Sequence, residues 1–330
     1  MPDGSASVRT SWVATAASSL GCPGHACVSG ERDHPRSRCV PRCSRPATDS
    51  RTRFDPVPDD ARWLPLQGTT NTRDLGGLPL TDGGTTVPGR VLRSDDLQEL
   101  TDHDVVVLVD DLGVTDVVDL RSSAEVRLEG RGPLRDQPEI AHRHFTLLPE
   151  AGTYTDVYAA EDDADVDLPE GWLESLLPRS VAAEHETETP AVRSYLGYLT
   201  DGADNVVGAL RAITAASGTA LVHCAAGKDR TGVVCALALE VAGVEREAVV
   251  ADYALTAERI DDVVGKLAAR PTYAQDMARR DVASHTPRAD SMRRLLDLLD
   301  ADHGGAAGWL AERGFGPEEQ TALRLRLTEA

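Results

Sequence analysis

The chain is poor in aromatic residues, has no long apolar run and lacks an excess of positive charge. Aromatic residues make up 4% of its 330 residues, against 41% for all hydrophobic types, so aliphatic side chains must dominate the core. No run of about 18 or more apolar residues occurs, and we therefore expect no transmembrane segment. The net charge of −20 argues against nucleic acid as a partner, because nucleic-acid binding requires a basic face.

The N-terminal part differs in composition from the rest. Residues 1–53 carry eight arginines, no lysine and four acidic residues, and they show no apolar period. Such a segment cannot bury enough apolar surface to fold alone. We therefore predict a disordered extension at 1–55 and one folded domain at 56–330, a length that a single core can serve.

Cysteine is scarce within the predicted domain. Residues 11–20 are too polar for a good signal peptide, and we expect a cytoplasmic protein, with secretion without a recognisable signal left open. The domain's two cysteines, Cys224 and Cys235, fit a reducing compartment; Cys235 lies in an apolar helical run and is expected in the core. The extension contains four further cysteines, whose loose spacing matches zinc ligands poorly. They are Cys22, Cys27, Cys39 and Cys43.

The most informative segment is 223–232, with the sequence HCAAGKDRTG. The apolar run 220–222 precedes it and the helix-like run 233–241 follows it. A strand that ends in such a loop before a helix aims backbone N–H groups at one point and forms an anion site. In such a site Cys224 would be held as a thiolate, and Arg230 could bind a phosphate through two hydrogen bonds. The motif therefore predicts phosphoryl transfer to cysteine.

The other residues of this loop fit the same chemistry. Gly227 stands where the backbone must curl closely around the anion, and the Thr231 hydroxyl could reach the cysteine sulfur. His223 is expected to support the loop rather than to act as a base. Lys228 could reach a second phosphate on the substrate. Phosphate binding is assigned to the loop residues Ala225, Ala226, Gly227, Lys228, Asp229 and Arg230.

The decapeptide is similar to the active-site loop of the cysteine-dependent protein tyrosine phosphatases. Its Gly-Lys-Asp-Arg form resembles the mycobacterial secreted branch of that family, whose members are reported to accept phosphotyrosine, phosphoserine or phosphothreonine, and phosphoinositides. Stretches 71–77, 92–97, 117–126 and 251–260 resemble the same branch. The resemblance implies a phosphatase that needs no metal or other cofactor and that forms a phosphocysteine on a phosphorylated protein or phosphoinositide substrate.

The resemblance also places supporting residues near the loop. Asn71, Arg73 and Asp74 are expected to buttress it from a turn held by side-chain hydrogen bonds and positive-φ glycines. The general acid, which protonates the leaving oxygen, follows a strand at 142–148 in that branch. Glu150 stands there and is the first candidate, with Asp156 and Asp229 behind it.

Residues 150–190 are acidic and irregular. Such a charge run is usually a solvated insertion, whereas long loops in compact domains are often lids, and the resemblance implies a helical lid. The sequence does not choose between an insertion and a lid, between protein and lipid substrates, or among oligomeric states.

Alternating elements predict an α/β fold with a central, mostly parallel sheet flanked by helices and a helical C-terminal part. A helix over 101–112 is favoured by the capping pair Thr101 and Asp104, and another is expected over 190–216. Ser94 and Asp95 are interpreted as a helix cap, and Arg121 and Glu125 as a structural ion pair. Strands are expected at 90–93, 114–120, 142–148 and 219–222.

Two other functions fit part of this pattern. One is an inactive phosphatase that only binds phosphorylated ligands, although Cys224, Arg230 and Thr231 are all in place. The other is a sulfur- or arsenate-handling enzyme with a similar cysteine loop. Arsenate reduction usually needs a resolving cysteine, and Cys235 lies too deep in the predicted helix for that role.

Overall fold

Five short strands lie at the centre of the fold. In the computed structural model, which describes residues 62–148, 185, 187–279 and 281–329, they make one five-stranded sheet in the order β1-β2-β5-β3-β4. β2, β5, β3 and β4 run parallel, and β1 pairs with β2 in the antiparallel direction. The strands are Arg73–Asp74 (β1), Val91–Ser94 (β2), Val114–Asp119 (β3), Ala141–His144 (β4) and Thr219–His223 (β5).

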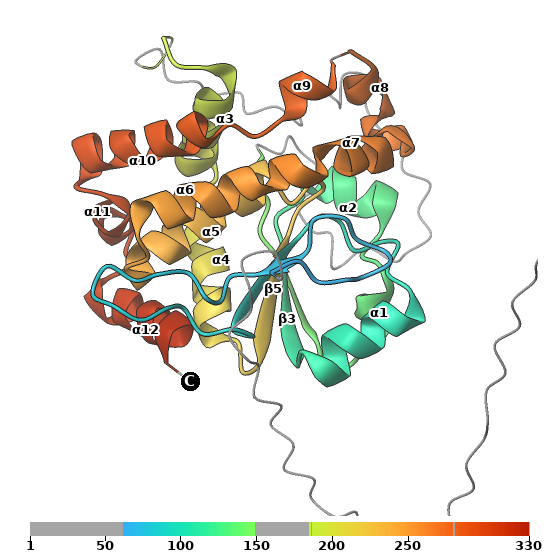
Figure 1. The fold of residues 1–330 in the computed structure, drawn as a ribbon, viewed down its shortest axis with the longest axis horizontal. Coiled ribbons are helices and arrows are strands. Elements are labelled where there is room, and N and C mark those ends of the chain that lie inside the picture. The colour runs from blue at the N-terminus through green and yellow to red at the C-terminus, as the bar shows by residue number, and fades with distance from the viewer. Residues whose placement is uncertain (1–61, 149–184, 186, 280, 330) are drawn as a thin grey trace, which may run out of the picture. The chain divides into compact units, whose positions relative to one another are not determined.

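Side chains alternate between the two faces of the sheet, as the pleat requires. Val117 and Leu221 face one hydrophobic cluster, which includes Leu108, whereas the neighbouring Val118 and Val222 face the larger one. Helices α4, α5 and α6 lie on the side of the larger cluster, and α1 lies on the other side (Figure 1). The inner strands β3 and β5 are therefore covered on both faces, and the expected α/β fold class is confirmed.

The helices account for most of the remaining chain, including the helical C-terminal part. α10 packs on α3 and α6, and α12 packs on α4 and α5. The α-helices are Asp102–Val106 (α1), Ser123–Glu129 (α2), Pro190–Asp201 (α3), Ala203–Ala215 (α4), Asp229–Ala242 (α5), Arg246–Leu255 (α6), Ile260–Ala268 (α7), Pro271–Arg279 (α8), Val282–His285 (α9), Ala289–His303 (α10), Ala306–Glu312 (α11) and Pro317–Thr328 (α12). Shorter helical turns are Val107–Asp111 (η2), Pro133–Asp136 (η3) and Thr256–Arg259 (η6).

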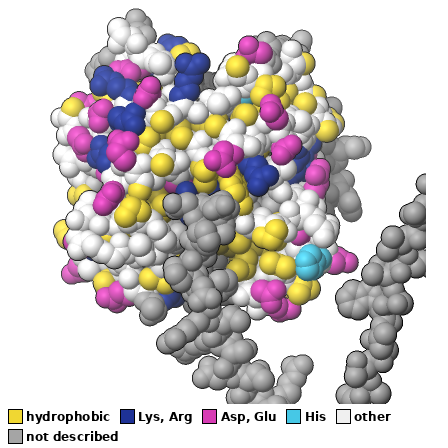
Figure 2. Space-filling model, in the orientation of Figure 1, with side chains coloured by type: hydrophobic (Ala, Val, Ile, Leu, Met, Phe, Trp, Pro, Cys, Tyr) yellow, Lys and Arg dark blue, Asp and Glu magenta, His cyan; other side chains and the backbone are white. Residues whose placement is uncertain are grey.

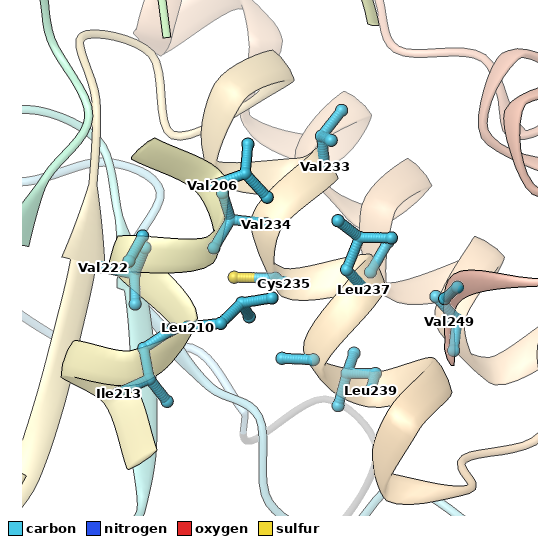
Figure 3. Packing of buried hydrophobic residues seen from close by; sticks show 14 of the residues in the cluster. Val206, Leu210, Ile213, Val222, Val233, Val234, Cys235, Leu237, Leu239 and Val249 are labelled. Carbon is cyan, nitrogen blue, oxygen red and sulfur yellow. The ribbon is translucent and has the colours of Figure 1, made fainter. Parts of the chain in front are cut away.

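Cys235 lies in the core, as expected. Its side chain stands on α5 among aliphatic residues of α4, α5 and β5 (Figure 3), and it is 1% exposed. Burial raises the pKa of this thiol to about 11. Cys235 is therefore a packing residue.

Two predicted elements differ in the structure. The helix over 190–216 is interrupted at Gly202, where a Cβ would lie 3.2 Å from the Leu147 Cα and 2.8 Å from the Tyr198 oxygen. The strand over 142–148 ends at His144, because the Thr146 hydroxyl then bonds the backbone of Leu148. Both differences involve contacts that the periodicity of the sequence does not report.

The helix predicted over 101–112 forms as a capped α-helix followed by a π-helical turn. Thr101 and Asp104 make the predicted capping box, and Gly113 follows with a φ of +63°. At Val107 the α-helix gives way to the π-helical turn η2.

The interpretation of Ser94 and Asp95 as a helix cap was wrong. Ser94 ends β2, and the Asp95 carboxylate accepts hydrogen bonds from the backbone N–H groups of Thr70 and Asn71. Asp95 therefore fixes the segment that precedes β1.

Several predicted features lie outside the described residues: the extension at 1–55 with its four cysteines, the carboxylates Glu150 and Asp156, and most of the segment 150–190. Within the described part of the chain, no helix combines the length and apolar character needed to cross a membrane.

Acidic and basic side chains are interspersed on the face shown in Figure 2.

Candidate active site

The loop that joins β5 to α5 lies at the carboxyl edge of the sheet. β5 ends at His223, beside the ends of β2 and β3, and α5 begins at Asp229. Ligands of parallel α/β sheets bind at this edge. The topology therefore places the predicted loop where a substrate can reach it.

Three successive carbonyl groups of the loop are hydrogen-bonded from behind. The carbonyl of one residue and the N–H of the next point in opposite directions across a trans peptide. The N–H groups of Ala226, Gly227 and Lys228 therefore point to the other side of the loop and form a concave row of donors. The bonds run from Asp96 N to Ala225 O (3.0 Å), from Asn71 Nδ2 to Ala226 O (2.8 Å) and from Arg93 Nη2 to Gly227 O (2.8 Å).

Gly227 is required by the curvature of the loop. Its φ is +63°, in the left-handed region, and a Cβ would lie 2.4 Å from the carbonyl oxygen of Ser94. Both the backbone conformation and the close approach to the end of β2 favour glycine.

A buried ionic network stands behind the loop. Asp252 on α6 binds Arg73 at 3.1 Å and Arg93 at 2.6 Å, and all three side chains are at most 1% exposed. Burial alone would raise the pKa of Asp252, but the two guanidinium charges outweigh it and hold this pKa well below its usual range. Burial, together with the charge of Arg93, lowers the pKa of Arg73 to about 10. Arg93 thus links this network to the Gly227 carbonyl.

Asn71 contacts the loop through the Ala226 carbonyl, and Arg73 contacts Asn71. Arg73 Nη1 donates to Asn71 Oδ1 at 2.5 Å, which leaves the Asn71 amide nitrogen to bond Ala226. Asp74 acts on the adjacent turn instead: its carboxylate accepts from the backbone N–H groups of Gly76 and Gly89, each at 2.7 Å. The glycine of this turn with positive φ is Gly77, at +80°.

Cys224 is the first loop residue and directly follows His223, the last residue of β5. Cys224 is a free cysteine that is 2% exposed. His223 Nε2 lies 3.6 Å from Asp119 Oδ2, an arrangement that favours the charged imidazole. Burial has the larger effect and lowers the pKa of His223 to about 4. His223 is therefore neutral near pH 7.

The Arg230 guanidinium pairs with Glu125, which the sequence analysis expected to pair with Arg121. Nη1 and Nη2 of Arg230 bind the two oxygens of Glu125 at 2.6 and 2.9 Å. Burial alone would raise the pKa of Glu125, but the charge of Arg230 and the hydrogen bonds it receives lower this pKa to about 2. The expected pair between Arg121 and Glu125 was wrong, because Arg121 precedes helix α2 and binds Asp119 instead.

The pairing with Glu125 leaves one edge of the Arg230 guanidinium for a ligand. Glu125 takes one N–H of each terminal nitrogen, and the Leu120 oxygen lies 3.4 Å from Nη1. The Nε–H and the second Nη2–H lie side by side on the opposite edge, which is the geometry that binds two oxygens of a phosphate.

Lys228, Asp229 and Thr231 have distinct surroundings. Lys228 Nζ donates to the His285 oxygen at 2.6 Å and lies 3.4 Å from Asp229 Oδ2. Asp229 Oδ1 accepts a hydrogen bond from the Tyr195 hydroxyl at 2.7 Å. The Thr231 hydroxyl is buried and has no hydrogen-bond partner among the residues that the structure describes.

Helices α7 and α8 pack against the loop. Ala225 belongs to a small hydrophobic cluster with Val263 and Leu267 of α7 and Tyr273 of α8. The Tyr273 hydroxyl also donates to Glu125 at 2.7 Å. These helices thus contact both the loop and the carboxylate that holds Arg230.

The sequence did not assign Glu125, Asp252, Tyr195, Tyr253 or Tyr273 to the site. Glu125 lies in the stretch 117–126, and Asp252 and Tyr253 lie in the stretch 251–260. Both stretches resemble the family, but the partners of these residues are far away in the chain. Nothing local marks Tyr195 or Tyr273. Among the described residues, no three His, Cys, Asp or Glu side chains are grouped so that they could hold a metal ion.

Comparison with known proteins agrees with this geometry. A model of the tyrosine phosphatase family matches residues 64–329. The triple specificity protein phosphatase PtpB of Mycobacterium tuberculosis is 31% identical over 290 residues, which cover 79% of this chain and 96% of that protein. A tyrosine-protein phosphatase of Nostoc commune is 32% identical over 118 residues, or 34% of this chain and 40% of that protein. The chain therefore belongs to the tyrosine phosphatase family.

Proposed function

We propose that this phosphatase hydrolyses phosphate monoesters without a metal, through a phosphocysteine at Cys224. The observation that carries the proposal is the arrangement of donors after β5. Three loop carbonyls are bonded from behind, so the N–H groups face the other way, and Arg230 keeps one edge of its guanidinium for a ligand. Cys224 begins the same loop.

The reaction would proceed in two steps. The Cys224 sulfur attacks phosphorus while Arg230 and the loop N–H groups of residues 225–230 bind the three equatorial oxygens. The bond from phosphorus to the leaving oxygen breaks, and that oxygen takes a proton from a carboxylic acid. Water then attacks the phosphocysteine, and the Thr231 hydroxyl, which has no other partner in the described chain, assists the departure of the sulfur.

Asp229 is the candidate acid that the described residues support. It is the first residue of α5, directly beside Arg230, and its side chain is 33% exposed. Glu150 and Asp156, the other two candidates, lie outside the described residues.

The substrates would be phosphorylated proteins. The relative from Mycobacterium tuberculosis is named for triple specificity, and we propose phosphotyrosine as the substrate here, with phosphoserine, phosphothreonine or phosphoinositides as further candidates. For phosphoinositides, Lys228 would have to leave the His285 carbonyl to reach a second phosphate. Rates on phosphotyrosine peptides and phosphoinositides, measured side by side with the wild type and Lys228→Ala, separate the two substrate classes.

Several wider features belong to the same proposal. We assign the catalytic domain to residues 56–330, with 150–190 as an insertion or lid. A nucleophilic cysteine works in its reduced state, and the two cysteines of the described chain are both free, which favours a reducing compartment such as the cytoplasm.

Replacement of the nucleophile tests the proposed chemistry. Cys224→Ser should abolish turnover of p-nitrophenyl phosphate while phosphate binding, measured by calorimetry, survives. The control is Cys235→Ala, which removes the buried thiol of α5 and should keep activity. Full activity of Cys224→Ser would remove Cys224 from the mechanism, and a loss of activity with EDTA that added metal restores would refute metal independence.

A further inference from the structure

One oxygen of the Asp229 carboxyl is hydrogen-bonded to a buried side chain, although the Asp229 side chain as a whole is partly exposed. Oδ1 accepts from the Tyr195 hydroxyl at 2.7 Å. Tyr195 is 1% exposed, whereas the Asp229 side chain is 33% exposed. The carboxyl group thus bridges a buried donor and the accessible end of the loop.

The hydrogen bonds behind Asp229 form a chain with one direction. The Tyr195 and Tyr253 hydroxyl oxygens lie 2.5 Å apart, and Tyr253 is also 1% exposed. A phenol has one proton to donate. Because Tyr195 gives its proton to Asp229, the hydrogen bond between the tyrosines must be donated by Tyr253. Burial and the nearby Asp229 charge raise the pKa of Tyr195 well above its ordinary value, so this donor keeps its proton.

This chain joins three helices and is fixed by packing. Tyr195 stands on α3, Tyr253 on α6, and Asp229 begins α5. The two tyrosine rings meet edge to face, with centroids 6.1 Å apart. Gly232 of the loop motif admits Tyr253, because a Cβ at Gly232 would lie 2.8 Å from the Tyr253 ring. The glycine therefore has a role in the position of Asp229.

The second carboxyl oxygen faces a cation. Lys228 Nζ lies 3.4 Å from Asp229 Oδ2 and is itself bonded to the His285 oxygen. A carboxylate that forms at Asp229 would therefore be stabilised at Oδ1 by the phenol and at Oδ2 by the ammonium.

We propose that Tyr195, backed by Tyr253, is a positioning residue that holds the Asp229 carboxyl as the acid for the leaving oxygen. The inference rests on the proposed function. In the first step the proton on Oδ2 of Asp229 moves to the leaving oxygen as its bond to phosphorus breaks and the bond from sulfur to phosphorus forms. In the second step the Asp229 carboxylate takes a proton from the attacking water, which restores the acid.

The test uses leaving groups of different basicity. Phenol is a much weaker acid than p-nitrophenol, so phenyl phosphate needs a proton donor and p-nitrophenyl phosphate needs one far less. kcat/KM reports formation of the phosphocysteine. We expect Tyr195→Phe to lower kcat/KM for phenyl phosphate by about 10- to 100-fold, the effect of one hydrogen bond to a charged group, and to lower it for p-nitrophenyl phosphate by less than about threefold.

Two further variants separate positioning from a merely structural effect. Tyr253→Phe should show the same selectivity with a smaller loss. Asp229→Asn should show it with a larger loss, and the double variant Tyr195→Phe/Asp229→Asn should be no worse than Asp229→Asn alone, because residues that act through one another are not additive. Leu199→Val, which loosens the packing of α3 in the core, should change both substrates alike.

The outcomes are distinct. Equal losses of Tyr195→Phe on both substrates, or additive losses in the double variant, would overturn the positioning role. Asp229→Asn without selectivity would overturn Asp229 as the acid and the inference with it, while Cys224→Ser would still report on the phosphatase mechanism by itself.

Discussion

Glu125 and Arg230 are 105 residues apart in the chain and share two hydrogen bonds, of 2.6 and 2.9 Å. Glu125 is 1% exposed and also receives the Ser122 N–H and the Tyr273 hydroxyl. Its position is therefore determined from three sides. Because Glu125 occupies one edge of the guanidinium, it also determines which edge a phosphate can use.

Glu125→Gln should weaken phosphate binding and catalysis together. Glutamine keeps the shape but offers Arg230 one acceptor oxygen and a second group that is itself a donor. Loss of one charge-assisted hydrogen bond predicts a fall in kcat/KM of about 10- to 100-fold, with a weaker inhibition constant for phosphate. Steady-state kinetics with inorganic phosphate as the inhibitor measure both.

A matched control exists on the far side of the fold. Glu319 also binds an arginine through both carboxyl oxygens, which accept from Nε and Nη2 of Arg211, and this pair is partly exposed. Glu319→Gln should keep wild-type kinetics. If the two variants behave alike, the pairing of Glu125 is structural and does not orient Arg230 for phosphate.

The sequence could predict the loop because its signals are local. The apolar run, the motif and the helix follow one another within residues 219–241, and β5, the loop and α5 form as expected. The pairing of Glu125 was missed because spacing along a helix was applied to Arg121, which lies before the N-cap Ser122. Its true partner depends on how α2 packs beside the loop.

The other failures have the same origin. The hydrogen-bond chain from Tyr253 through Tyr195 to Asp229 joins α6, α3 and α5, and no periodicity relates them. The break at Gly202 depends on the approach of Leu147, which no local pattern reveals. Residues that contact the loop from helices distant in the sequence can therefore be identified only once the three-dimensional fold is known.

His223 should make stability depend on pH between 6.5 and 4. Its pKa is lowered from 6.5 to about 4 by burial, so the unfolded chain binds the proton more tightly than the folded protein. The resulting stability is fully present above pH 6.5 and is lost as the pH falls towards 4. A pKa lowered to this extent corresponds to a contribution on the order of 3 kcal/mol to the free energy of unfolding.

Urea unfolding at pH 7.5 and 4.5 measures this effect. The wild type should lose about 2 kcal/mol more than His223→Asn between these two pH values, because asparagine does not titrate. The comparison between the two proteins cancels the titration of all other groups. Equal losses would mean that His223 is solvated enough to be protonated in the folded state.

Asp252→Asn should destabilise the fold strongly. The substitution leaves the buried Arg73 and Arg93 without their shared carboxylate, and an uncompensated buried charge costs about 3–5 kcal/mol. Equilibrium unfolding in urea measures the loss. Asp290→Asn is the control, because its pair with Arg293 is exposed and its removal should leave the unfolding midpoint unchanged. A loss below about 1 kcal/mol for Asp252→Asn would show that water reaches the network.

Gly227→Ala should lower activity by about 100-fold while the fold survives. The added Cβ meets the Ser94 carbonyl oxygen at 2.4 Å, and the φ of +63° is strained for alanine. The loop must shift, and a displacement of about 1 Å in a catalytic group can cost about 100-fold in rate. Gly265→Ala on α7 is the matched control: a Cβ there meets nothing within 4 Å, and alanine favours a helix by about 0.5–1 kcal/mol. Kinetics and thermal melting of the two variants show whether catalysis depends on the curvature of the loop rather than on the loss of a glycine as such. A Gly227→Ala enzyme with the wild-type rate would contradict a role for this curvature.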